Sequence, residues 1–121
     1  MAYRITLRDE NLLWVEFVGD VSSEDMENYI EEYKQYLERA TAEHPFHFLV
    51  DSSQVGKLSA GARKALTSAF RVSDPRVGNT ALFGANRYAR VLTSFVLKAV
   101  GRDDIRMFDS EEEAVAWLKE A

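Results

Sequence analysis

The sequence contains no cysteine and only two histidines and two prolines among its 121 residues. Without cysteine there is no disulfide framework, no thiolate metal ligand and no cysteine nucleophile. His44 and His47 are too few for a closed zinc site. No motif marks a serine or carboxylate partner that would make either histidine a general base. We therefore predict no metal, no cofactor and no catalytic residue.

Long apolar runs are also missing, since none approaches the roughly 20 residues of a membrane-spanning helix. The start, Met-Ala-Tyr-Arg-Ile-Thr, lacks the basic and apolar regions of a secretory signal. The apolar share of 46% and the charged share of 29% are those of an ordinary globular protein. We expect one soluble domain over residues 1–121, located in the cytoplasm and with no membrane span.

Charge is unevenly distributed along the chain, although the net charge is only −5. Residues 1–56 carry 4 basic and 12 acidic side chains, residues 57–106 carry 10 and 3, and residues 107–121 carry 1 and 5. This asymmetry favours a positive docking face, but acidic and basic helices that neutralise each other would explain it too. We expect no nucleic-acid partner, because the net charge is negative and Phe70, Phe83 and Phe95 fall on predicted core faces.

Hydrophobic periodicity predicts an α/β fold. Alternating segments at residues 3–8 and 12–19 predict an antiparallel hairpin. Strands and helices then alternate along the chain, which demands parallel strands with right-handed crossovers. We predict a mixed five-stranded sheet and about four helices, with strands at residues 46–51, 80–84 and 105–108, helices at 22–40, 59–73, 86–100 and 110–118, and a loop at 52–57.

The predicted caps and faces are specific. Ser22, Ser59 and Asn86 are expected to cap helix starts, and Gly101 to end the third helix. Either Asp109 or Ser110 is expected to cap the last helix. The apolar face of the third helix is predicted to consist of Tyr88, Val91, Leu92, Phe95, Val96 and Ala99.

The segment after the central strand is the likeliest working surface by position, because sites in α/β sheets lie beyond the carboxyl ends of strands. Asp51 is predicted to end that strand. A phosphate on Ser59 would be stabilised by the helix N-terminus, although a plain N-cap explains this serine equally. The candidate partner or anion surface comprises Asp51, Ser52, Ser53, Lys57, Arg63, Asn86, Arg87 and Arg90.

Four segments in a consistent order carry a family resemblance that covers essentially the whole chain. They are Val50-Asp51, Leu58-Ser59-Ala60-Gly61-Ala62-Arg63, Ala81-Leu82-Phe83-Gly84 and residues 108–118. Together they resemble the SpoIIAA-like family, a STAS/SEC14-like branch related to anti-sigma-factor antagonists. The resemblance implies a STAS fold and a switch serine, matched here by Ser59, with Leu58 where the antagonists carry an acidic residue.

The resemblance implies a non-enzymatic bacterial regulatory or protein-interaction module, phosphorylated at Ser59. Its partner would be a regulatory kinase or an anti-sigma-like protein. The alternative is a SEC14-like carrier of a hydrophobic small molecule or lipid, in which the many aromatic side chains line a pocket rather than pack a core. An enzyme would need Asp51, His47 and Arg87 to converge near the strand ends. A homodimer could form through an exposed edge of the N-terminal hairpin.

Overall fold

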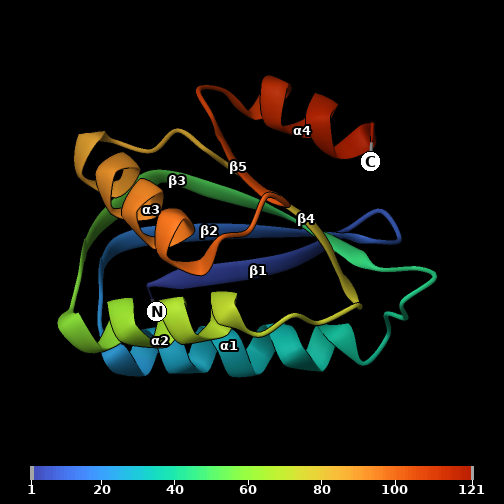
Figure 1. Cartoon of the computed structure of the whole chain (residues 1–121), viewed down its shortest axis with the longest axis horizontal. Helices are drawn as coiled ribbons and strands as arrows, with labels where there is room; N and C mark the ends of the chain where they lie inside the picture. Colours follow the sequence, from blue (N-terminus) through green and yellow to red (C-terminus); the bar gives the residue numbers. More distant parts are fainter. Residues whose placement is uncertain (1, 121) are drawn as a thin grey trace.

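The computed structural model describes residues 2–120, which form a five-stranded sheet with helices on both faces (Figure 1). The spatial order of the strands is β1-β2-β3-β4-β5. β1 is antiparallel to β2, and every other neighbouring pair is parallel. The predicted mixed sheet with an N-terminal hairpin is therefore confirmed. The strands are β1 (Tyr3–Arg8), β2 (Leu12–Val21), β3 (Phe46–Leu58), β4 (Val77–Phe83) and β5 (Ile105–Phe108).

Three helices connect the parallel strands: α1 (Ser23–Leu37), α2 (Ala60–Arg71) and α3 (Arg87–Val100). A fourth, α4 (Glu111–Lys119), follows β5. α1 and α2 lie side by side on one face of the sheet, and α4 covers the other (Figure 1). Successive side chains of β3 point to opposite faces of the sheet. Phe48 and Val50 belong to the larger core beneath α1 and α2, whereas Leu49 packs with Ala114 and Leu118 of α4.

The helix caps follow the sequence closely. Ser22 and Asp25 form a capping box, in which the Ser22 hydroxyl accepts from the Asp25 amide at 3.1 Å. Ser59 and Asn86 cap α2 and α3 as predicted, and Ser110 caps α4. Gly101 ends α3 in the left-handed region with φ 66°, a conformation that favours glycine.

The predicted loop at residues 52–57 is wrong, because β3 continues through it to Leu58. The partner strand is also longer than predicted, and Gly19 of β2 pairs with Val55. Two register shifts interrupt this part of the ladder, which hides the alternation that would mark a strand. The Asp20 carboxylate accepts from the Lys57 amide at 2.8 Å and holds the irregular segment in place. Asp51 therefore does not end the strand.

The predicted apolar face of α3 is wrong for four of its six members. Ala89 and Val96 are buried, but Val91 is 65% exposed and Phe95 is 73% exposed. No element among residues 2–120 covers this outer side, so the apolar stripe is wider than the surface it packs against. Tyr88 and Ala99 are exposed as well. The argument against nucleic acid from buried aromatics fails for Phe95, whereas Phe70 and Phe83 are half-buried.

Candidate functional site

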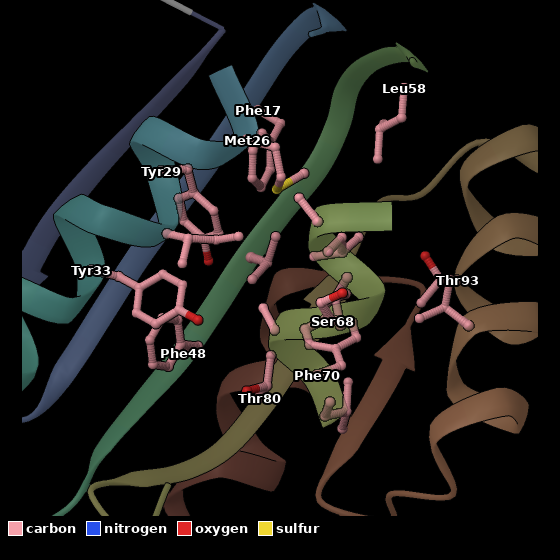
Figure 2. Close-up of a pocket in the computed structure, with 18 of the residues that line it drawn as sticks. Phe17, Met26, Tyr29, Tyr33, Phe48, Leu58, Ser68, Phe70, Thr80 and Thr93 are labelled. Carbon is pink, nitrogen blue, oxygen red and sulfur yellow. The ribbon is translucent and has the colours of Figure 1, made fainter. Parts of the chain in front are cut away.

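A cavity of about 450 Å³ lies between the sheet and helices α1, α2 and α3 (Figure 2). β3 and β4 form its floor through Phe48, Val50, Thr80 and Leu82. The α2 side is built from small residues, Ala65 and Ala69 among them, which leave space in front of the sheet. The sequence left open whether the aromatic side chains line a pocket or pack a core, since the same residues are compatible with close packing. The other lining residues include Phe17, Val21, Met26, Tyr29, Ile30, Tyr33, Leu37, Ser52, Val55, Leu58, Leu66, Ser68, Phe70, Val72, Val77, Leu92, Thr93, Val96 and Ile105.

Four aromatic rings form one wall of the cavity. The Tyr29 ring centroid lies 5.0 Å from Phe17 and 5.2 Å from Tyr33, and Tyr33 lies 5.3 Å from Phe48. The spacing of Tyr29 and Tyr33 on α1 places both on one face of that helix. Burial raises the pKa of Tyr29 far above its ordinary value, so its phenol stays protonated at physiological pH.

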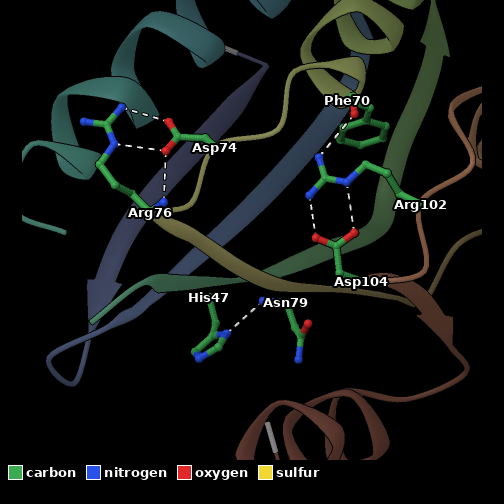
Figure 3. A network of polar contacts seen from close by, with 7 residues as sticks. All are labelled: His47, Phe70, Asp74, Arg76, Asn79, Arg102 and Asp104. Carbon is green, nitrogen blue, oxygen red and sulfur yellow. Dashed lines mark hydrogen bonds and ion pairs between the residues drawn. The ribbon is translucent and has the colours of Figure 1, made fainter. Parts of the chain in front are cut away.

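Two ion pairs flank one end of the cavity (Figure 3). Arg76 donates from Nε and Nη2 to the two carboxylate oxygens of Asp74, at 3.1 and 2.8 Å. This pairing holds the pKa of Asp74 below its usual value. Arg102 donates in the same bidentate way to Asp104, and its Nη1 donates to the Phe70 carbonyl at 3.2 Å. Asp74 and Arg102 therefore line the cavity with their charges already paired.

Ser59 is exposed at the start of α2, where its hydroxyl accepts from the Ala62 amide at 3.0 Å. The same oxygen lies 3.3 Å from the Ser23 hydroxyl at the start of α1. Gly61 makes this approach possible, because a Cβ there would overlap the Ser23 hydroxyl. Lys57 and Arg63 are exposed on either side in sequence. Ser59 is thus an exposed residue whose hydroxyl caps α2 and contacts the first residue of α1.

The remaining residues of the predicted surface have different surroundings. Asp51 accepts from the Ser53 amide and hydroxyl, at 2.9 and 2.6 Å. Asn86 caps α3 and donates to the Val55 carbonyl at 3.3 Å. Ser52 does not belong to this surface, because strand alternation turns it inward with Val50 and it is only 6% exposed.

The two arginines of the predicted anion site differ in their surroundings. Arg90 donates to the Asp109 carboxylate at 3.0 Å, and both side chains are largely exposed. Arg87 is also exposed. The carboxylate beside Arg90 offsets part of the positive charge that was expected to attract an anion. Anion binding here stays a prediction.

The alternative of a catalytic cluster of Asp51, His47 and Arg87 does not assemble. His47 and Asp51 lie four residues apart on β3, which separates them by about 13 Å along the strand. His47 Nδ1 accepts from the Asn79 amide at 2.9 Å (Figure 3), and burial lowers its pKa. Within residues 2–120 no group of three or more histidine, aspartate or glutamate side chains is placed to hold a metal ion. No helix in the same range has the length and apolarity to cross a membrane.

Comparison with known proteins places the chain in a family. The SpoIIAA-like family model matches residues 12–119. A protein from Shewanella loihica PV-4, of the DUF3478 family and with a SpoIIAA-like fold, is similar in structure with a TM-score of 0.72 and 17% identity, over 97% of this chain and 93% of that one. The anti-sigma factor antagonist SpoIIAA in its unphosphorylated form gives a TM-score of 0.69 and 11% identity, over 99% and 100% of the two chains. No curated protein matches the sequence. The chain belongs to the SpoIIAA-like family.

Proposed function

We propose that this protein is a non-enzymatic binding module that holds a small apolar molecule in the cavity beneath α1, α2 and α3. The cavity itself carries the proposal. Protein interiors are normally packed with few voids larger than a water molecule. A space of about 450 Å³ is instead within the range of ligand pockets, roughly 300–1,000 Å³.

The chemistry of the lining supports an apolar ligand. Most lining side chains are aliphatic or aromatic, and the polar ones are mainly hydroxyls. Asp74 and Arg102 are held in ion pairs with Arg76 and Asp104, so neither offers a free charge to a ligand. This pattern of apolar walls and few polar groups is typical of small-molecule sites. It favours the carrier function over the protein-interaction function implied by the family resemblance.

Filling the cavity is expected to abolish this binding. Ala69→Phe on α2 would place a ring in the space that a ligand needs, so the affinity for the fluorescent probe N-phenyl-1-naphthylamine should fall more than tenfold. Ala116→Phe, an exposed alanine on α4, is the matched control and should leave probe affinity unchanged. Titration followed by fluorescence measures both. A wild-type protein that does not bind the probe, or an Ala69→Phe variant that binds it equally well, would contradict the proposal.

A second function, protein interaction switched at Ser59, is supported by a separate observation. Ser59 is exposed, caps α2 and lies against Ser23 of the neighbouring helix. A phosphate there would sit at the positive end of α2 and press against α1. Such a charge would alter the surface that α1 and α2 present together. The partner we propose is a regulatory kinase or an anti-sigma-like protein.

The charge of this cap, rather than its shape, is expected to control partner binding. Ser59→Asp and Ser59→Asn both keep an N-cap acceptor and differ only in charge. The amount of partner captured from the source cells should be at least tenfold lower with the Asp variant than with the Asn variant. Intact-mass measurement of the native protein should also show one added phosphate. Identical captures by both variants, together with an unmodified native mass, would rule the switch out.

A further inference from the structure

Three deeply buried residues line the cavity with hydroxyls that form no hydrogen bond among residues 2–120. They are Tyr29 and Ser52, each 6% exposed, and Thr80, which is 8% exposed. Only the Trp14 indole nitrogen is both inaccessible and unpartnered in the described chain, so these hydroxyl oxygens keep some accessible surface. In an apolar cavity such a hydroxyl is satisfied only by a ligand atom or by water.

The Tyr29 and Thr80 hydroxyls lie near Tyr33 and Phe48 (Figure 2). Tyr29 contacts Tyr33, Tyr33 contacts Phe48, and Phe48 is the register neighbour of Thr80 on the adjacent strand. Figure 2 shows the Tyr29 and Tyr33 rings ending in their hydroxyls on the cavity side. Ser52, Ser68 and Thr93 bring hydroxyls from β3, α2 and α3. Hydroxyl donors are therefore distributed over a lining that is otherwise mostly apolar.

The charges nearby do not suit an anionic ligand. A carboxylate beside Tyr33 would approach the carboxylate of Asp74. Burial, and after it the negative charge of Asp74, raises the pKa of the Tyr33 phenol. Arg102, the arginine that lines the cavity, spends its three donor nitrogens on Asp104 and the Phe70 carbonyl. Lys34 also belongs to the lining but is an exposed side chain at the rim. An uncharged acceptor meets none of this repulsion.

We propose, building on the proposed apolar-ligand function, that the ligand carries an uncharged hydrogen-bond acceptor such as a carbonyl or ester oxygen. The Tyr29 hydroxyl donates to this oxygen, and the Tyr33 and Thr80 hydroxyls lie on the same side. The apolar body of the ligand contacts the aliphatic and aromatic side chains of the lining.

Two probes of nearly equal shape test this arrangement: benzophenone, which has a carbonyl oxygen, and diphenylmethane, which has a methylene group in its place. Tyr29→Phe removes only the donor, so it should lower the affinity for benzophenone about three- to tenfold, the effect of one hydrogen bond. The affinity for diphenylmethane should change less than twofold. Thr80→Val tests the second hydroxyl in the same way. Tyr36→Phe, on α1 but outside the cavity lining, is the matched control and should affect neither probe. Displacement of N-phenyl-1-naphthylamine measures each affinity.

The stability of the ligand-free variant separates a binding role from a structural one. Because the Tyr29 hydroxyl has no protein partner, Tyr29→Phe should leave the urea midpoint of unfolding unchanged or raised. A lowered midpoint would mean that the hydroxyl supports the fold, and would overturn the inference. Equal effects of Tyr29→Phe on both probes, or tighter binding of diphenylacetate than of benzophenone, would also overturn it while leaving the apolar-ligand function standing. If wild type binds neither benzophenone nor diphenylmethane, the apolar-ligand function itself fails.

Discussion

Replacing Leu49 by alanine is expected to lower the free energy of unfolding by about 3 kcal/mol. Leu49 lies on β3 with 0% of its surface exposed, and it packs with Ala114 and Leu118 of α4. The removed methyl groups would leave a cavity between the sheet and a helix of only nine residues. Since α4 is the helix that covers this face, few other side chains can move to fill the space that Leu49 leaves. Urea unfolding followed by circular dichroism measures the change.

Phe95→Ala on α3 is the informative control for Leu49→Ala. The apolar pattern of the sequence places both residues in the core, but Phe95 is 73% exposed. We expect this substitution to change the free energy of unfolding by no more than about 0.5 kcal/mol, as is usual for surface positions. A cost for Phe95→Ala similar to that of Leu49→Ala would show that another surface covers α3 in solution.

Replacing Arg102 by methionine is expected to cost about 2 kcal/mol of folding free energy. Arg102 joins two parts of the chain, since it pairs with Asp104 before β5 and donates to the Phe70 carbonyl near the end of α2. Its side chain is 20% exposed and that of Asp104 is 31% exposed. The substitution would leave a carboxylate and a carbonyl without their donor at sites with little water. The expected cost is smaller than that of breaking a fully buried pair, because both side chains retain some solvent contact.

Arg90→Met provides the matched comparison, because the Arg90–Asp109 pair has exposed fractions of 54% and 78%. Exposed pairs of this kind contribute little, so a change of no more than about 0.5 kcal/mol is expected. Thermal and urea unfolding of both variants measure the difference. Equal losses for the two arginines would contradict the view that burial and the Phe70 contact make Arg102 the stronger link.

Periodicity within each segment is sufficient to predict most of the secondary structure. The alternation in residues 3–8 and the helical spacing from Met26 to Leu37 are period signals that neighbouring elements did not disturb. The polar run at residues 52–57 has the composition of a loop, because its strand conformation depends on pairing with the bulged end of β2. Hydrogen bonds to a distant strand, such as that between Lys57 and Asp20, leave no periodic trace in the segment itself.

The sequence by itself determined the order of strands and helices, the caps at Ser59, Asn86 and Gly101, and the family to which the chain belongs. Only the tertiary structure decided which apolar faces are covered and where space remains. Periodicity shows which side chains share a face of a helix, but not whether another element lies against that face. For this reason Phe95 is exposed on α3, while Tyr29 on α1 lines a cavity that periodicity alone could not distinguish from a packed core.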